Sequence, residues 1–247
     1  MNYFFKGENA MNHSYQDALA FLGIEGAHPG GFELTKQLLK NEKIDQSTKI
    51  LDAGCGTGQT SQFLAQHFLC QVFALDNHPE MVKHANRRFQ QAKIPNNVYM
   101  NSIEDLPFTN NFFDFIMAES TTAFTNIQQS LCEYYRVLKP GGTLISIDMT
   151  AETELNLNQK KEIRKFYNLT NVLTQSEWLK AFKKEGFKNL KILKSNTVLE
   201  ELKNSSAVDN LILPLNESLE QIIEEHYRLV LTCGNSLGYR VFRANKE

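Results

Sequence analysis

The sequence predicts an α/β fold built around a mostly parallel sheet. Strand-like and helix-like segments alternate from residue 49 onward, a glycine-rich turn follows an apolar strand that ends in an acid, and the composition is that of an ordinary globular chain. Strands that alternate with helices of about 10–15 residues form βαβ units, whose parallel sheet is covered on both faces. We therefore expect a doubly wound sheet buried between helices.

The composition bounds the size of the fold and the class of partner. The chain has 247 residues, of which 42% are hydrophobic and 22% charged, which suits one large domain or one domain with a small appendage. Its formal net charge is -2, whereas a nucleic-acid or anionic-membrane footprint needs a basic stripe. We therefore expect a small-molecule partner and no nucleic acid.

The four cysteines suggest a reducing compartment. Cys55, Cys70, Cys132 and Cys233 are far apart and form no CxxC pair, so their spacing indicates neither a zinc site nor a disulfide framework. Residues 1–21 lack the apolar core of a signal peptide. No run approaches the roughly 20 apolar residues of a membrane span. These features predict a cytoplasmic protein with no membrane span and no metal.

The first half of the chain supplies the first βαβ units. Phe63, Leu64 and Phe68 recur at helical spacing, and Pro79 stands where a first helical turn tolerates it. In order, we expect a helix at 14–24, a loop and helix at 26–41, a strand at 49–54, a helix at 58–69, a strand at 70–76 and a helix at 78–92.

The second half completes the sheet and adds helices after the fifth strand. Pro140 ends a helix, and Gly141 and Gly142 then make a turn before the fifth strand. In order, we expect strands at 97–102 and 112–120, a helix at 127–138, a strand at 143–149, helical segments at 151–169 and 175–187, a strand at 188–195, a helix at 217–231 and a strand at 238–246.

The turn LDAGCGTG at residues 51–58 is the strongest local signal for a ligand site. Gly54, Gly56 and Gly58 follow a strand that ends at Asp52. Glycine is used where φ is positive or where a ligand approaches the backbone closely. In a parallel sheet, ligands bind outside the carboxyl ends of the strands, which is where this turn lies. An ordinary tight turn between a strand and a helix is the alternative.

A second acid, Asp76, ends the next strand about 18 residues after Gly58. A carboxylate there accepts hydrogen bonds from both hydroxyls of a ribose, although it can also cap the following helix. A dinucleotide turn, G-x-G-x-x-G, needs its third glycine at position 59, which is Gln59, and no P-loop pattern occurs. Asp52 also suits an ammonium group better than a pyrophosphate.

Four motifs follow one another between residues 49 and 149: LDAGCGTG, ALDNHPEMV, LPFTNNFFDFIMA and RVLKPGGTLI. Together they resemble the class I S-adenosylmethionine-dependent methyltransferases, in particular the small-molecule branch related to the ubiquinone/menaquinone methyltransferases. The resemblance implies a Rossmann-like sheet of seven strands, with an antiparallel last strand beside the fifth. It also implies S-adenosyl-L-methionine as cofactor, S-adenosyl-L-homocysteine as product, and in-line displacement at the methyl carbon.

The resemblance assigns the cofactor contacts residue by residue. The turn would wrap the methionine part of the cofactor, Asp52 would steady it near the amino group, and Asp76 would hold the ribose hydroxyls. The turn residues are Gly54, Cys55, Gly56, Thr57 and Gly58. Asn77 and Met81 would line the adenine side, and Ala118 and Glu119 would lie near the methylthio group.

One position departs from the family pattern. Relatives commonly carry an acid that meets the adenine amino group, and the aligned residue here is Ser102. Ser102 can still accept a hydrogen bond, and Ile103 can pack on the adenine ring. Glu104 or Asp105 can also substitute for the missing acid.

Three residues are candidates for the acceptor side. His28, in AHPGGF, is either part of an ordinary loop or a group that closes over the cofactor as a base. Tyr15 lies on the preceding helix and could fold over the site, and Glu119 ends the fourth strand. We take His28 and Glu119 as candidate catalytic residues, and Tyr15 and His28 as candidate substrate contacts.

Other tempting side chains have simpler structural roles. Cys55 is read as a small packing residue, because methyl transfer from a sulfonium needs no covalent enzyme intermediate. His226 and Tyr227 are read as core or solvated-face residues of an amphipathic helix, and Trp178 as core.

The function predicted is S-adenosylmethionine-dependent methyl transfer to a small organic acceptor. The alternatives are a non-catalytic, cofactor-binding regulatory or partner subunit and, less favoured, an NAD-dependent oxidoreductase. We divide the chain into an N-terminal helical segment that covers the site (1–45) and a methyltransferase domain (46–247) with cap helices within 151–180 and 205–235. The acceptor, its reacting atom, the pathway and the oligomeric state stay open.

Overall fold

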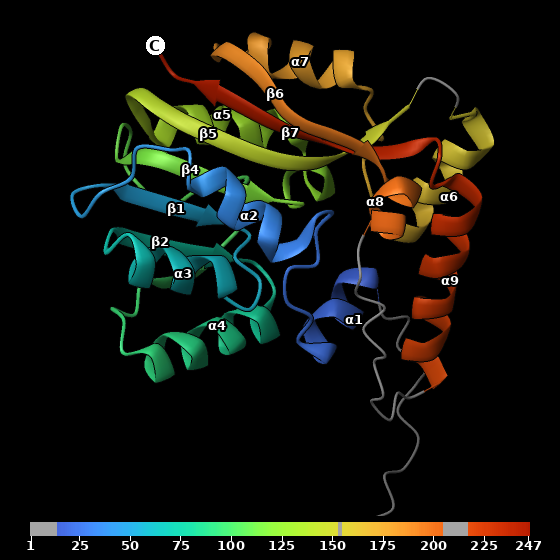
Figure 1. Ribbon diagram of the computed structural model, residues 1–247, viewed down its shortest axis with the longest axis horizontal. Helices are drawn as coiled ribbons and strands as arrows, with labels where there is room; N and C mark the ends of the chain where they lie inside the picture. Colours follow the sequence, from blue (N-terminus) through green and yellow to red (C-terminus); the bar gives the residue numbers. More distant parts are fainter. Residues whose placement is uncertain (1–13, 153–154, 205–216) are drawn as a thin grey trace, which may run out of the picture.

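A seven-stranded sheet forms the centre of the computed structural model, which describes residues 14–152, 155–204 and 217–247 (Figure 1). The strand order is β3-β2-β1-β4-β5-β7-β6, and β7 runs antiparallel to both of its neighbours. The strands are β1 (Lys49–Ala53), β2 (Gln71–Asp76), β3 (Val98–Met100), β4 (Phe113–Glu119), β5 (Leu138–Ala151), β6 (Lys188–Thr197) and β7 (Leu237–Asn245). The predicted Rossmann-like sheet, with an antiparallel last strand beside the fifth, is confirmed.

Several helices begin at residues whose side chains satisfy free backbone N–H groups. Ser14, Asn156 and Thr174 each form a capping box at the start of a helix. The helices are α1 (Tyr15–Leu22), α2 (Gly31–Leu39), α3 (Gln59–His67), α4 (Pro79–Ala92), α5 (Ile127–Val137), α6 (Leu157–Tyr167), α7 (Gln175–Lys184), α8 (Val198–Asn204) and α9 (Glu217–Cys233), with a 3-10 turn η1 (Thr122–Phe124).

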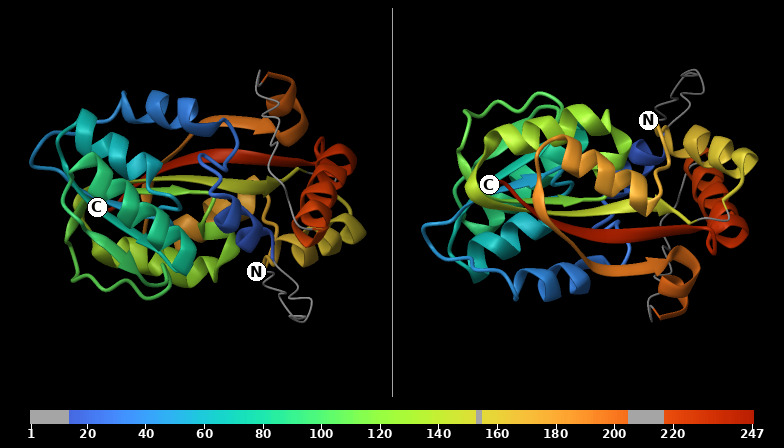
Figure 2. Two further views of the ribbon diagram at one scale, coloured as in Figure 1. Left: turned by 90° about the horizontal axis from the view of Figure 1, so that it is seen from below. Right: turned by 90° about the horizontal axis from the view of Figure 1, so that it is seen from above.

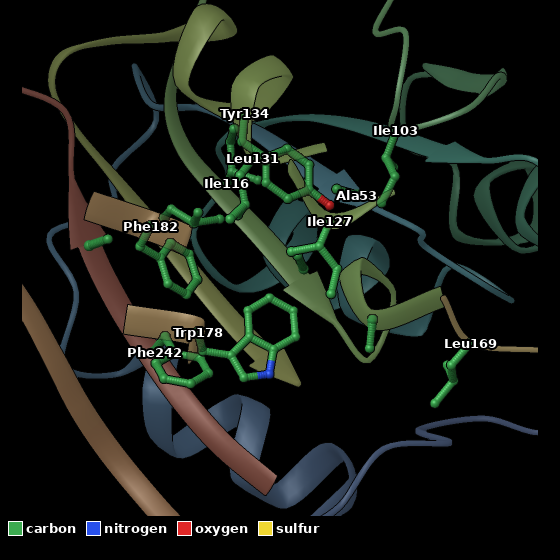
Figure 3. Packing of buried hydrophobic residues seen from close by; sticks show 14 of the residues in the cluster. Ala53, Ile103, Ile116, Ile127, Leu131, Tyr134, Leu169, Trp178, Phe182 and Phe242 are labelled. Carbon is green, nitrogen blue, oxygen red and sulfur yellow. The ribbon is translucent and has the colours of Figure 1, made fainter. Parts of the chain in front are cut away.

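Two layers of helices cover the sheet (Figure 2). Apolar residues of α2 and α3 form one cluster with one face of the sheet, and α5 and α7 contribute to a larger cluster on the opposite face. In the larger cluster, Trp178 and Phe182 of α7 pack on Phe242 of β7 and are fully buried, as is Tyr134 of α5 (Figure 3). The core role predicted for Trp178 is therefore confirmed.

Four helices gather beyond the carboxyl ends of the central strands (Figure 1). Helix α1 contacts α6 and α9, α6 contacts α9, and α8 contacts α9, β6 and β7. Helix α7, by contrast, packs on α5 and β6 at the side of the sheet. The division into 1–45 and 46–247 stays a prediction, and its residues 1–13 and 205–216 lie outside the described part of the chain.

Several predicted element boundaries differ from the structure, including those of the fifth and sixth strands. The fifth strand begins at Leu138, not at residue 143, because Leu138 pairs with Phe113 across an irregular register, and the expected turn at Gly141 lies within β5. Gly141 keeps the positive φ of a turn residue, +82°. The strand expected at 188–195 continues to Thr197 and passes directly into α8, which the sequence did not indicate.

Candidate active site

A cavity of roughly 490 Å³ lies at the carboxyl ends of β1, β2 and β4. One wall is the glycine turn after β1 with the ends of β2 and β4, and the other comes from α1, the loop 24–29, α6 and α9. Ligands of open α/β sheets bind at this edge. We therefore take this cavity as the candidate active site.

A second hollow, of roughly 700 Å³, lies along α4 and shares Thr57 with the cavity. It is more open and mostly polar. Its Arg88 is already engaged, because it pairs with Glu25 and donates to the Thr57 carbonyl at 2.9 Å. Its openness and its occupied guanidinium make it the weaker candidate.

The glycine turn takes a shape that few other residues allow. Gly54, Gly56 and Gly58 all have positive φ, at +78°, +53° and +80°. A Cβ on Gly54 would lie 2.1 Å from Thr121 Cγ2, and the Gly54 N–H donates to Leu75 O at 2.7 Å. The backbone therefore turns tightly against the neighbouring strands and leaves the cavity side open.

Asp76 holds this turn in place and faces the cavity. Its Oδ2 accepts from the Gly56 N–H, and its Oδ1 accepts from the His78 N–H, both at 2.9 Å. Burial raises the pKa of this carboxyl. The N-cap of α4 is His78, whose Nδ1 accepts from the Glu80 N–H at 3.2 Å. The alternative role of Asp76, as the N-cap of the helix that follows it, therefore does not apply.

Asp52 lies under the turn, out of the cavity lining. Its side chain is 1% exposed, and its Oδ2 accepts from Ser61 Oγ at 2.6 Å. Burial, with a further contribution from Glu119 and Asp76, raises the pKa of Asp52 to about 7. Three acids thus share this end of the site, and a cation bound there would relieve their mutual repulsion.

Glu119 and His28 meet across the cavity wall. His28 Nε2 lies 3.3 Å from Glu119 Oε1, and His28 Nδ1 lies 3.2 Å from Pro29 O. Thr60 donates to Glu119 Oε2 at 2.6 Å, and the Thr35 hydroxyl donates to Oε1. The two threonines come from α2 and α3, and no sequence motif indicated them.

An aromatic group closes the opposite end of the cavity. The Tyr15 ring stacks on His226 with centroids 5.0 Å apart and planes at 20°, and it meets Tyr167 edge-on at 5.0 Å. Burial raises the pKa of Tyr15 to about 12. Tyr167 and His226 were not among the predicted site residues, because they are 59 positions apart and only the packing of α6 on α9 brings them together.

Most of the predicted site residues line the cavity. Those that line it are Tyr15, His28, Gly54, Cys55, Gly56, Thr57, Asp76, Asn77, Met81, Ile103 and Glu119. Outside the lining are Asp52, Gly58, Ser102 and Ala118.

Predicted site residues that do not line the cavity have other contacts within the fold. Gly58 is the N-cap of α3, and Ala118 is fully buried opposite Ala53. Ser102 Oγ accepts from the Glu104 N–H at 3.1 Å. Cys55 lines the cavity with a largely buried thiol whose pKa is raised by burial, so it is a poor nucleophile.

Charge is distributed unevenly around the cavity. Within the described ranges, its lining contains Asp76 and Glu119 but no lysine or arginine. The same part of the chain holds no group of three or more His, Cys, Asp or Glu arranged to bind a metal ion. None of its helices is both long and apolar enough to cross a bilayer.

Known proteins similar to this chain include methyltransferases. A family described as "Methyltransferase domain" matches residues 51–146. The uncharacterized methyltransferase YodH of Bacillus subtilis is 32% identical over 236 residues, which cover 94% of this chain and 99% of that relative. The ubiquinone/menaquinone biosynthesis C-methyltransferase UbiE of Blochmanniella floridana is 29% identical over 142 residues, or 55% of each chain.

A solved structure supports the same fold. Phosphoethanolamine N-methyltransferase 2 of Haemonchus contortus, in complex with phosphomonomethylethanolamine and S-adenosylhomocysteine, superposes with a TM-score of 0.76 at 19% identity. The superposition covers 93% of this chain and 56% of that chain. The likeness is therefore one of fold.

Proposed function

The chain belongs to the class I S-adenosylmethionine-dependent methyltransferases, and we propose that it methylates a small, uncharged organic acceptor held between the glycine turn and helices α1, α6 and α9. The methyl transfer follows from the family. The acceptor and the roles of individual residues are our proposal. Family membership favours this function over a non-catalytic subunit or an NAD-dependent oxidoreductase.

The cofactor end of the cavity fits S-adenosylmethionine in shape and charge. The turn Gly54–Gly58 leaves room for a ligand against its backbone, and Asp76 has lone pairs free for the two ribose hydroxyls beyond its two backbone contacts. Met81 and Ile103 line the cavity where the adenine ring would pack. Asp52, Asp76 and Glu119 favour a ligand that carries positive charge. S-adenosylmethionine supplies a methyl group already activated on a sulfonium.

The main task left to the chain is alignment. An acceptor fixed in line with the methyl group reacts without the entropic cost of a bimolecular encounter, which is worth on the order of 7–11 kcal/mol in the best intramolecular reactions. Helix α1 closes over the cavity and is tied to the cofactor side by Asp17, whose Oδ1 lies 3.1 Å from His78 Nε2. Helix α1 would thus exclude water as well as hold the acceptor.

Glu119 and His28 have different proposed roles. Hydroxyl groups already donate to both Glu119 oxygens, so this carboxylate is best placed to attract the positive charge of the methionine part. His28 is the better candidate to take a proton from an acceptor, because it lines the cavity and its Nε2 lies 3.3 Å from Glu119 Oε1, a carboxylate that would stabilise the protonated imidazole.

The proposal of an uncharged acceptor rests on one observation: no lysine or arginine is among the described residues that line the cavity. Phosphate and carboxylate groups are bound in proteins chiefly by arginine, lysine and helix N-termini. An acceptor such as phosphomonomethylethanolamine would meet Asp76 and Glu119 in this cavity, and no lysine or arginine of the described residues. We also place the protein in the cytoplasm, because its four cysteines are free thiols.

The first test is calorimetric titration of S-adenosylhomocysteine and of NAD. We expect micromolar binding of the first ligand alone, weakened at least 100-fold in Asp76→Ala because two charge-assisted hydrogen bonds are lost, each worth about 1.5–3 kcal/mol. The matched control is Asp114→Ala, since Asp114 lies on the same sheet at the amino end of β4 and pairs with Lys139. Binding of NAD, or equal affinities in wild type and Asp76→Ala, would contradict the assignment.

A further inference from the structure

His226 lines the cavity, with one ring nitrogen hydrogen-bonded within the protein and the other without a partner among the described residues. Tyr167 Oη lies 2.8 Å from His226 Nδ1. No described residue hydrogen-bonds Nε2, and the His226 side chain lines the cavity. Burial lowers the pKa of His226 to about 4, so the ring is neutral near pH 7. The open nitrogen therefore carries either a lone pair or a single hydrogen.

Tyr167 allows both forms of the neutral ring. Its hydroxyl can donate to a bare Nδ1, which leaves a hydrogen on Nε2, or accept from Nδ1–H, which leaves a lone pair on Nε2. A hydroxyl group on a ligand complements both forms because it donates and accepts. An ammonium complements only the lone pair, and a carboxylate or phosphate only the hydrogen.

The surroundings of His226 also favour an uncharged partner. Tyr15 covers one face of the imidazole, and no described residue of the lining at this end of the cavity carries a charge. Phe124, Met149, Val198, Val230 and Leu237 are apolar, and Gln16 and Asn168 are polar but uncharged. A charged group placed here would lose its hydration without gaining an opposite charge.

We propose that His226 Nε2 binds a hydroxyl group of the methyl acceptor, and that Tyr167 fixes the imidazole for this contact. The acceptor is then an uncharged, hydroxyl-bearing compound whose apolar part lies on the aromatic and aliphatic wall. His226 and Tyr167 determine acceptor specificity at the end of the cavity remote from Asp76. This inference rests on the proposed function, since it identifies the acceptor class of the same site.

The test uses sets of probes that share one skeleton and differ in one group. The full-length protein, loaded with S-adenosylhomocysteine, is titrated by calorimetry with alcohols, primary amines and phosphate monoesters of benzyl, 1-naphthylmethyl and geranyl skeletons. We expect at least one alcohol to bind, with its amine and phosphate counterparts at least tenfold weaker. Tighter binding of an amine or a phosphate, or no binding of any alcohol, would overturn the proposal.

Variants then test the two side chains. We expect His226→Phe, which keeps an aromatic ring, to weaken alcohol binding about fivefold and His226→Gln to retain part of it, because loss of one neutral hydrogen bond costs about 1 kcal/mol. Tyr167→Phe should weaken it about threefold. Affinity for S-adenosylhomocysteine should not change in any of them, nor should alcohol binding in the controls His67→Phe and Tyr227→Phe.

The outcomes separate this inference from the proposed function. Equal alcohol affinity in wild type and His226→Phe would refute the role of His226 while the cofactor site stands. Failure of wild type to bind S-adenosylhomocysteine would instead refute the proposed function itself. A His226→Phe variant that loses S-adenosylhomocysteine binding together with the alcohol would show a structural role for His226 and overturn the recognition role.

Discussion

Substitution of Gly54 by alanine perturbs the glycine turn in two separable ways. Gly54 has φ of +78°, a region that residues with a Cβ rarely adopt. The new Cβ would also lie 2.1 Å from Cγ2 and 2.7 Å from Cβ of Thr121. Rotation of the Thr121 side chain can move Cγ2, but its Cβ is fixed by the backbone, so a steric conflict persists.

The two effects have different magnitudes. Left-handed backbone costs a residue with a Cβ about 1–2 kcal/mol, and forcing extra volume into a packed site costs about 1–3 kcal/mol. We therefore expect Gly54→Ala to lower the free energy of unfolding by about 2–5 kcal/mol. Gly141→Ala is the matched control, because its φ is +82° and nothing lies within 4 Å of the added Cβ. It should cost only about 1–2 kcal/mol.

Urea denaturation of Gly54→Ala, Gly141→Ala, Thr121→Gly and the double variant Thr121→Gly/Gly54→Ala separates the backbone cost from the steric cost. In the background of Thr121→Gly, which removes the obstructing side chain, Gly54→Ala should cost no more than Gly141→Ala does in the wild type. S-adenosylhomocysteine affinity should fall in Gly54→Ala and stay unchanged in Gly141→Ala. Equal destabilisation by Gly54→Ala and Gly141→Ala in the wild type would refute the close approach of the turn to Thr121.

Two further predictions concern pH and the core. Asp52 has a pKa raised from 3.8 to about 7, so the native state holds an extra proton between these values and stability must fall as pH rises through this window. Asp52→Asn should therefore flatten the decline in unfolding free energy measured by urea denaturation from pH 5 to pH 8; an unchanged slope would argue against a buried, protonated Asp52. Phe182→Ala should lower the free energy of unfolding by about 3–5 kcal/mol, because Phe182 is fully buried against Trp178 and Phe242. A loss of less than about 3 kcal/mol would mean that the surrounding side chains collapse into the space left by the ring. Leu157→Ala, at a side chain that is 84% exposed, is the control and should change it by less than about 0.5 kcal/mol.

The local parts of the fold were predictable because their signals are local. The strand that ends at Asp52, the glycine turn and the acid Asp76 lie within a short stretch, and the alternation of apolar strands with helices predicts their placement in a parallel sheet. The meeting of His28 with Glu119, both candidates from sequence, follows from strand position and from the loop before α2. Their catalytic roles stay predictions.

The parts that sequence reasoning missed depend on contacts between distant segments. The start of β5 at Leu138 is set by pairing with Phe113. His226 was interpreted as a core or solvated-face residue, and Tyr167 was not predicted as a site residue. The sequence of one helix does not show which other helix packs against it. Their hydrogen bond exists only after α6 and α9 come together.

The most direct test of the central claim is transfer of a deuterated methyl group. Wild-type protein and Asp76→Ala are incubated with S-adenosylmethionine labelled in its methyl group and with a protein-free extract of small molecules, separated by ion exchange into anionic, cationic and uncharged fractions. Mass spectrometry then identifies labelled products. The account predicts label in the uncharged fraction with wild type and none with Asp76→Ala. Label in the anionic fraction, or no labelled product in any fraction, would contradict it.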